Sequence, residues 1–349
     1  MRVTQQRLGG IRWIVADGDG GEVFAGLGAL MRETIREIAG DAEADRLRQL
    51  AGAREGQLAA VMDASAAAHP GAWAELTALA DGAGLPVEAL ALLNCRGDLA
   101  GAVSGGAGED AESCSDLAWS GDRSFIAHNE DEPVSYQGLC ALVTLHLDGQ
   151  QPVTAYWVPG FLPANAFSVT GSGVVISVDH VPVRAPANAP GRAFVARELQ
   201  RTATSVAEAV EFLGANPSAG GFSYTIGDPA GRVVIVEAAA GECGWREVSD
   251  LAWHTNHGRY IKAAVTRSHG TSVRRGEILG ALDVPAEPDH QWFLDALDTV
   301  RADPAGDKVA TTLCTFVAEL STGQILLRDR DASPVTLPIV DFLAGRPLV

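Results

Sequence analysis

The sequence predicts an α+β fold in which antiparallel sheets are covered by helices. Three observations support this class. Apolar residues recur at helical spacing through the first 95 residues, the spacing changes to a period of two after residue 113, and later strand-like runs come in clusters separated by pairs of helices. A parallel sheet would instead need a helix between successive strands, so the clustering favours antiparallel sheets.

The first 95 residues are predicted to be mainly helical. Apolar side chains between Glu22 and Ile38 repeat every three or four residues and form one buried stripe, which predicts a single long helix. Shorter helices are expected after it, and Pro86 stands at the first turn of the last one, where its missing N–H costs nothing. These shorter helices are predicted at residues 42–51, 57–68, 73–80 and 87–93.

Residues 97–113 (GDLAGAVSGGAGEDAES) separate this helical part from the rest of the chain. They are rich in glycine, serine and alanine and predict a flexible, exposed loop. A sheet is expected to begin at Cys114, so we divide one domain into a mainly helical segment, residues 1–113, and a sheet-forming segment, residues 114–349. Strands are predicted at 115–120, 123–128, 140–147, 152–158, 168–169, 173–178, 222–226, 232–237, 311–320 and 324–328, and helices at 193–201, 205–213, 273–282 and 291–300.

The composition restricts the partners. A formal net charge of −18 argues against nucleic acid and anionic membrane surfaces, because both require a basic surface. Neither a signal peptide nor a run of 18 apolar residues is apparent, so we expect a cytoplasmic protein that acts on a small molecule. The five cysteines are far apart and include no Cys-x-x-Cys pair, which argues against a disulfide framework.

No metal is expected from the sequence. His254 and His257 are three residues apart in a strand and loop, a spacing that does not bring ligands together, and there is no His-Glu-x-x-His motif.

Cys114 is the residue that we single out for chemistry. It stands where the loop meets a strand, so its thiol is reachable while its backbone is anchored. If the bond before it were cut, the new α-amino group would lie beside the thiol and act as its base. We expect this thiol to be a favoured thiolate and the other four cysteines, in apolar runs or at helix ends, to react poorly. On the residues alone, a small buried hydrophobic role for Cys114 stays open.

Several separated patches resemble the penicillin acyltransferase-like cysteine Ntn hydrolases. Each patch is short, but their order agrees with the family, and Asn256 follows Cys114 by 142 residues, about the distance that the family shows. The patches are Leu92–Asp98, similar to Leu-x-Asn-x-Arg-x-Glu; Cys114-Ser115, similar to Gly-Cys-Thr; Ile126–Asp131, similar to Gly-x-Asn-x-Asp; Trp253–His257, similar to His-x-Asn-His; Ser272–Arg275, similar to Ser-x-x-Arg; and Thr312–Val317, similar to a terminal hydrophobic strand.

The resemblance implies a four-layer αββα fold and a specific set of roles. It implies self-cleavage between Ser113 and Cys114, with the two chains staying associated, and then hydrolysis or transfer of a linear amide through an acyl-enzyme without a cofactor. Cys114 would be the nucleophile, Asp131 would orient its α-amine, and Asn256 would donate to the oxyanion.

Three further residues would support this site: Asn129 by a nearby backbone N–H, His257 beside the oxyanion segment, and Arg96. Two roles are open for Arg96, a surface salt bridge or a contact that holds the segment before Cys114 near Asp131. The sequence departs from the family pattern with Ser113 in place of glycine before the nucleophile, Asp98 in place of glutamate, and Glu130 in place of an aromatic residue.

Alternative functions also fit the sequence. An acyl-CoA-dependent N-acyltransferase is one; we favour hydrolysis because 44 acidic against 26 basic residues do not suit an anionic donor. A non-catalytic relative that binds a small ligand is another. A third, a cysteine peptidase with a separate base, would need His128, His254 or His257 beside Cys114.

Overall fold

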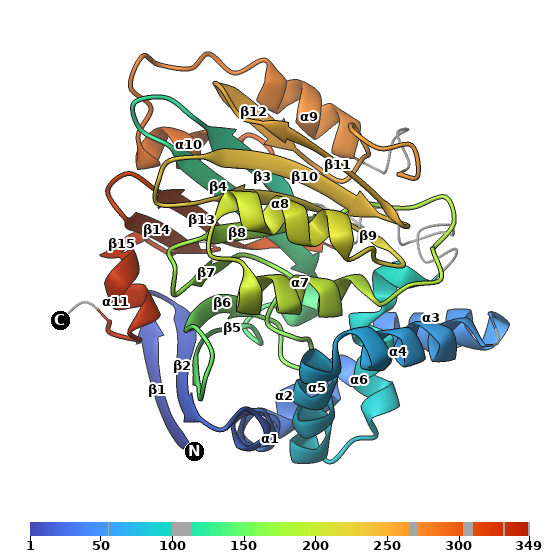
Figure 1. The fold of residues 1–349 in the computed structure, drawn as a ribbon. Coiled ribbons are helices and arrows are strands. Elements are labelled where there is room, and N and C mark those ends of the chain that lie inside the picture. Colours follow the sequence, from blue (N-terminus) through green and yellow to red (C-terminus); the bar gives the residue numbers. More distant parts are fainter. Residues whose placement is uncertain (55, 100–113, 265–270, 303–309, 331, 348–349) are drawn as a thin grey trace.

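The computed structural model describes most of the 349 residues (Figure 1). It describes residues 1–54, 56–99, 114–264, 271–302, 310–330 and 332–347.

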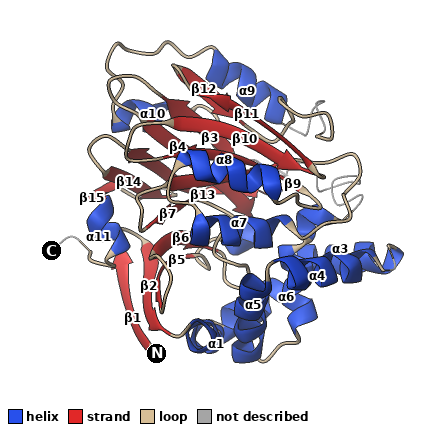
Figure 2. Cartoon of the chain, viewed as in Figure 1, coloured by secondary structure: helices blue, strands red, loops and turns tan. Residues whose placement is uncertain are grey.

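Two sheets form the centre of the molecule (Figure 2). The nine-stranded sheet has the order β1-β2-β5-β6-β7-β8-β9-β10-β11, and the six-stranded sheet has the order β12-β3-β4-β13-β14-β15. Neighbouring strands are antiparallel except β2 and β5, which pair in parallel. The strands are β1 (Arg2–Leu8), β2 (Ile11–Gly18), β3 (Ser115–Trp119), β4 (Phe125–Pro133), β5 (Ala141–Leu147), β6 (Val153–Trp157), β7 (Ser168–Thr170), β8 (Val175–His180), β9 (Gly221–Gly227), β10 (Val233–Ala239), β11 (Glu242–Glu247), β12 (Leu251–His254), β13 (Ala310–Glu319), β14 (Gln324–Asp329) and β15 (Val335–Pro338).

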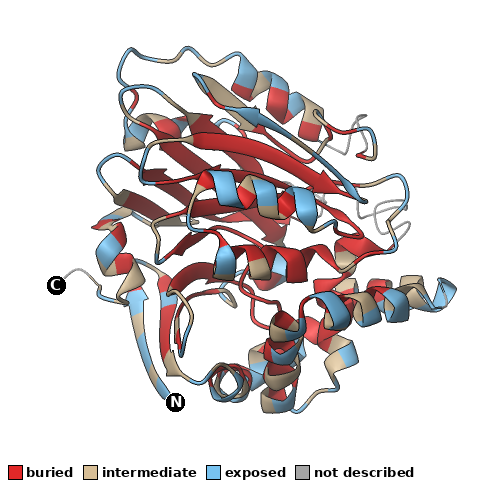
Figure 3. Cartoon of the chain, viewed as in Figure 1, coloured by how far each residue is buried: buried red, intermediate tan, exposed pale blue. Residues whose placement is uncertain are grey.

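Helices cover the outer face of each sheet. In Figure 1, α7 (Arg192–Thr202) and α8 (Val206–Ala215) lie over strands β8 to β10, where their apolar sides join one buried cluster. On the other sheet, α9 (Ser272–Gly280) and α10 (His290–Asp298) bury apolar side chains with those of β3, β4, β13 and β14. The four-layer αββα fold is therefore confirmed, and Figure 3 shows the resulting burial of the central strands.

The predicted N-terminal helices form a separate group beside the sheets. Two glycines let α1 and α5 approach closely: a Cβ on Gly28 would lie 2.1 Å from the carbonyl oxygen of Leu79, and one on Gly82 would lie 1.9 Å from that of Ala25. These helices are α1 (Gly20–Leu30), α2 (Arg32–Ala39), α3 (Ala42–Ala53), α4 (Gln57–Ala68), α5 (Pro70–Ala83) and α6 (Val87–Asn94), and the chain ends with α11 (Ile339–Leu343).

The single helix expected from Glu22 to Ile38 is two helices. Met31, with φ −105° and ψ 20°, ends α1 and precedes α2. One non-helical residue barely changes the spacing of a stripe, so the apolar side chains stay buried across the break and the pattern does not reveal it.

The strands β1 and β2 were not expected in the helical segment. Most of β1 is exposed and polar, so it carries no alternating pattern, whereas β2 is buried from Trp13 to Ala16 and reads as a continuous apolar run. The predicted loop, residues 97–113, was expected to be exposed. Its first three residues, Gly97, Asp98 and Leu99, are instead buried. The remainder of that loop lies outside the described residues.

None of the helices in the described parts of the chain combines the length and the apolar character that crossing a membrane requires.

Candidate active site

Cys114 stands directly before β3, which lies between β12 and β4. Its side chain is 8% exposed, and its Sγ lies 3.7 Å from the carbonyl oxygen of Asp131. Burial, and after it the negative charge of Glu130, raise the pKa of the Cys114 thiol well above its usual range. The expectation of a favoured thiolate is therefore wrong for the chain with its peptide bond before Cys114 intact. Ser113, on the other side of the predicted cleavage site, lies outside the described residues.

The other cysteines differ in exposure. Cys95 and Cys314 are buried, Cys140 is partly buried, and Cys243 is exposed on the edge strand β11. Burial raises the pKa of each of these thiols. Cys243 is thus accessible on an exposed strand rather than in an apolar run or at a helix end, while the poor reactivity expected of these four cysteines stays a prediction.

Arg275, in the first turns of α9, connects Cys114 with Asn256. Its guanidinium donates to the Cys114 carbonyl oxygen at 2.7 Å, to Ser115 Oγ at 2.6 Å and to Asn256 Oδ1 at 2.7 Å. A guanidinium has donors in a fixed fork and no acceptor, so these contacts hold three groups at set positions. The sequence patch that contains Arg275 was noticed, but no role was assigned to this residue.

Asn256 lies in the loop after β12 and is fully enclosed. Its backbone N–H donates to Ser272 Oγ at 2.8 Å, and its Nδ2 donates to the carbonyl oxygen of His180 at 3.1 Å. Because Oδ1 accepts from Arg275, the orientation of the amide is determined: the donor Nδ2 must be on the opposite side.

Asp131 occupies β4, in register with Thr312 of β13, whose hydroxyl donates to Asp131 Oδ1. Burial raises the pKa of Asp131 to about 7, although the positive charge of Arg275 and the Thr312 hydroxyl oppose the increase. This carboxyl can therefore gain or lose a proton near neutral pH.

The three predicted supporting residues have other partners. Asn129 donates from Nδ2 to the carbonyl oxygen of Leu297 at 2.9 Å and accepts from Thr315, so its side chain is anchored to the α10 layer. His257 Nδ1 lies 2.9 Å from Ser272 Oγ, which also accepts from the Asn256 backbone. Burial lowers the pKa of His257 to about 4, so its ring is neutral at pH 7.

Arg96 is mostly buried and pairs with Glu132, the residue after Asp131. Its Nη2 lies 2.6 Å from Glu132 Oε1, and its guanidinium lies 4.8 Å from the centre of the Phe161 ring. This placement joins the turn after α6 to the end of β4.

A buried network that the sequence did not reveal adjoins Cys114. His128 Nδ1 lies 2.7 Å from Asp116 Oδ1, and its Nε2 lies 2.9 Å from Glu130 Oε2. Burial alone would lower the pKa of His128, but Asp116 and the hydrogen bonds outweigh it and raise the pKa well above its usual value. The Cys114 sulfur, a ring nitrogen of His128 and a carboxylate oxygen of Glu130 lie within 4.8 Å of one another.

In the sequence, this network corresponds to polar residues at every second position of otherwise apolar strands. His128 and Glu130 alternate along β4 and therefore point to one face, and Asp116 is in register with His128. Of the three histidines considered as a base, His128 is beside Cys114, but both of its ring nitrogens are engaged by carboxylates.

His254 forms a second buried network with two acidic residues. Its Nδ1 lies 3.2 Å from Asp179 and its Nε2 lies 3.0 Å from Glu237. Burial opposes protonation of His254, yet the two carboxylates raise its pKa to about 9. Burial, and after it Asp116, raise the pKa of Asp179 to about 7.

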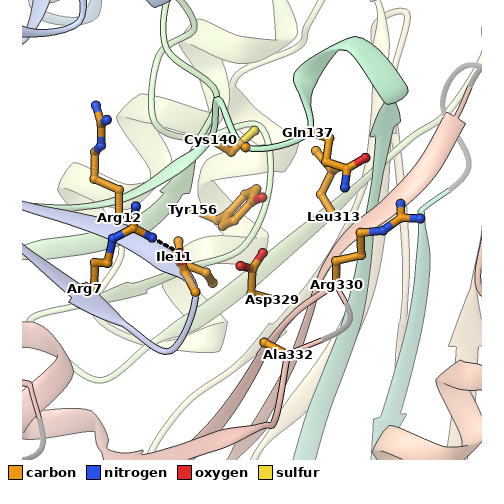
Figure 4. Close-up of a pocket in the computed structure, with 12 residues that line it drawn as sticks. Arg7, Ile11, Arg12, Gln137, Cys140, Tyr156, Leu313, Asp329, Arg330 and Ala332 are labelled. Atoms are coloured by element: carbon orange, nitrogen blue, oxygen red, sulfur yellow. Dashed lines mark hydrogen bonds between the residues drawn. The ribbon is translucent and has the colours of Figure 1, made fainter.

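A pocket of about 340 Å³ is lined by residues of both sheets (Figure 4). Its lining includes Arg7, Arg12, Arg330 and Asp329, and Tyr156 lies between Arg7 and Arg330 in the view. Its lining also includes Gly10, Ile11, Gln137, Gly138, Cys140, Leu313 and Ala332. It is thus a basic pocket on an acidic protein.

Two mainly antiparallel sheets packed between helical layers are the arrangement of the Ntn-hydrolase fold. Residues 119–329 match the family model described as acyl-coenzyme A:6-aminopenicillanic acid acyl-transferase, and the chain belongs to this family. It is therefore an enzyme of the Ntn-type amidohydrolase and acyltransferase class, which confirms the resemblance. The matched segment begins five residues after Cys114.

Solved structures of low sequence identity are also similar to the chain. Two variants of the conjugated bile acid hydrolase from Clostridium perfringens give TM-scores of 0.48 and 0.49, with 12% identity over 65% of this chain and 93% of theirs. Penicillin V acylase from Agrobacterium tumefaciens gives a TM-score of 0.42, with 12% identity over 67% of this chain and 89% of its own. No curated protein sequence matches.

Proposed function

We propose that this enzyme cuts itself between Ser113 and Cys114 and then hydrolyses a linear amide of a small N-acyl compound through an acyl-enzyme on Cys114. The observation that carries the proposal is the link through Arg275, which joins the backbone of Cys114 to the side chain of Asn256. A cysteine with only a structural role has no need of a buried guanidinium that also orients an amide.

Self-cleavage begins with attack of the Cys114 sulfur on the carbonyl carbon of Ser113. A C–S bond forms, the C–N bond to Cys114 breaks, and the nitrogen takes up the thiol proton and becomes an α-amine. Water then cleaves the thioester, which leaves a carboxylate on Ser113 and restores the thiol. Burial raises the pKa of Asp131 to about 7, so in this proposal its carboxyl exchanges protons near neutral pH during these steps.

Turnover repeats this chemistry on a substrate. The α-amine takes the thiol proton, the sulfur attacks the amide carbon, and the substrate amine leaves with that proton; water then releases the acid. Asn256 Nδ2 is our candidate donor to the oxyanion, since Arg275 holds the amide with its donor side away from the guanidinium. Burial raises the pKa of the Cys114 thiol, and only cleavage supplies the α-amine that serves as its base in turnover, so we expect amidase activity only after cleavage.

The two product chains, residues 1–113 and 114–349, stay associated in this proposal. Residues 1–113 include β2, which is paired along its length with β5, and β1, which is paired with β2. The N-terminal helices also belong to the same apolar core as strands β5 and β6. Cutting one peptide bond leaves these contacts in place.

Acyl transfer from an anionic donor is the second candidate. The preference for hydrolysis depended on the overall acidic charge, but Arg7, Arg12 and Arg330 provide a local basic pocket. Leu313 lines that pocket and precedes Cys314, the register partner of Glu130. A phosphate-bearing acyl thioester offered with and without an amine acceptor separates transfer from hydrolysis.

Intact mass and thiol labelling test the proposal. The purified protein should give fragments that end at Ser113 and begin at Cys114, and Cys114→Ala should abolish both the cut and amidase activity on a series of N-acyl anilides. Labelling is done with Cys243→Ser, because the exposed Cys243 would otherwise compete. In the cut protein, a limiting electrophile should modify Cys114 first, with activity falling in proportion. Full activity in an uncut chain, or in Cys114→Ala, would overturn the proposal.

A further inference from the structure

Three side chains beside β3 and β4 have the donor atoms of a metal site. Cys114 contributes a sulfur, His128 a ring nitrogen and Glu130 a carboxylate oxygen, and the three atoms lie within 4.8 Å of one another. All three residues are buried. Thiolate, imidazole and carboxylate together are a donor set that zinc accepts, and three such ligands leave a fourth position open.

A hydrogen-bonded shell orients the histidine. Asp116 Oδ1 lies 2.7 Å from His128 Nδ1, which assigns the Nδ1 proton to this contact and leaves Nε2 facing Glu130. Asp116 is itself held from the opposite sheet, by Ser177 Oγ at 2.9 Å and Thr225 Oγ1 at 2.6 Å. A histidine that ligates a metal in a protein usually donates from its other ring nitrogen to such a carboxylate, which fixes the orientation of the ring.

A neighbouring set of donors is a weaker candidate. Asp116, His128 and Asp179 also converge, but both carboxylates already have partners: Asp116 accepts from two hydroxyls, and Asp179 bonds with His254. Glu130 Oε2, in contrast, has one hydrogen bond, the Nε2–H of His128, and a cation can replace that proton while keeping both atoms as ligands.

We propose that Cys114, His128 and Glu130 bind a divalent cation of the zinc class and that its binding blocks the Cys114 thiol. Two protons leave on binding, one from the thiol and one shared by His128 and Glu130, and three ligand bonds form. This assignment departs from the expectation of no metal, which rested on the spacing of His254 and His257 and on the absence of a His-Glu-x-x-His motif. Binding itself does not depend on the proposed reaction; only the loss of activity does.

The test uses the purified full chain after treatment with a chelator, in the Cys243→Ser background. One equivalent of Zn²⁺ should bind by calorimetry, and Co²⁺ should give a near-ultraviolet sulfur-to-metal absorption band that shows thiolate ligation. Glu130→Gln, which keeps the shape of the side chain, should weaken Zn²⁺ binding at least tenfold. Asp116→Asn should weaken it about 10- to 100-fold, as is usual when a ligating histidine loses the carboxylate that orients it. Circular dichroism checks that each variant is folded.

Two results would overturn the inference: no binding of either metal, or a Co²⁺ sulfur band that persists in Cys114→Ala. Cys114→Ala removes few atoms, so it stays informative if the charge variants fail to fold. Failure of the inference is separable from failure of the proposed function. An enzyme that cuts itself and hydrolyses amides without binding zinc rejects the metal site alone. Zinc binding together with full amidase activity in Cys114→Ala rejects the proposed nucleophile alone.

Discussion

Replacing Arg275 by methionine removes the guanidinium that links the Cys114 backbone to the Asn256 side chain. Arg275 is 5% exposed, and its guanidinium donates to three acceptors, the Cys114 carbonyl oxygen, Ser115 Oγ and Asn256 Oδ1, at 2.6 to 2.7 Å. A buried acceptor left without a donor costs about 1–3 kcal/mol, and the three losses overlap because one side chain serves all of them. We therefore expect Arg275→Met to lower the free energy of unfolding by about 3–5 kcal/mol.

The assay compares Arg275→Met with Arg274→Met. Arg274 is the adjacent residue and is exposed, so its variant makes the same chemical change without the contacts. Urea unfolding should show a midpoint lower by about 1–2 M for Arg275→Met, given slopes of about 2–3 kcal/mol per M. Turnover of the folded fraction should fall about 100-fold, because Asn256 loses the contact that orients its amide. Equal midpoints, or equal turnover in the two variants, would refute this account of Arg275.

Three further predictions concern the groups around Cys114. Asn256→Ala should lower turnover by about two to three orders of magnitude with the fold intact by circular dichroism, and wild-type turnover would remove this residue from the site. Asp131→Asn should slow self-cleavage or turnover and abolish any inflection near pH 7 in the rate, measured from pH 5 to 9, because the pKa of Asp131 is about 7. The pKa of His254 is raised from 6.5 to about 9, so its stabilising effect is complete below pH 6.5 and lost as pH rises through 9. Urea unfolding between those pH values should show a loss of about 3 kcal/mol that is absent in His254→Gln; an equal slope in both proteins would contradict this.

The architecture could be predicted because it depends on apolar periodicity. Helices α3 to α8 and strands β3 to β6 follow side-chain spacing along the chain, and their burial agrees with that spacing. Edge elements could not be predicted in the same way. The strand β11 reads ECGWRE and is mostly exposed, so nothing in its composition alternates, and its pairing with β10 is a tertiary contact.

Local motifs predict part of the candidate site. They do not predict the contacts between residues that are far apart in the sequence. The patches single out Cys114, Asp131 and Asn256 as candidates, but Arg275 is visible only as part of one patch, because its contacts join residues about 160 and 19 positions away. The network of His128, Asp116 and Glu130 was not predicted for the same reason, because its contacts depend on how the strands pair. A histidine in a strand has no charge partner until the register with β3 places Asp116 opposite it.

Burying several ionisable groups between the sheets costs desolvation free energy, and the observed pairing reduces that cost. An isolated carboxylate or imidazolium moved into an apolar interior is strongly unfavourable, whereas hydrogen-bonded pairs lose much less. Asp116 is shared by a histidine of its own sheet and two hydroxyls of the other, so its contacts cross the interface between the sheets. Replacing one member leaves the others buried without partners, so we expect a single substitution in this network to lower the free energy of unfolding. The same groups that are costly to bury hold polar atoms in fixed positions beside the Cys114 sulfur, which is the condition that nucleophilic catalysis and metal binding share.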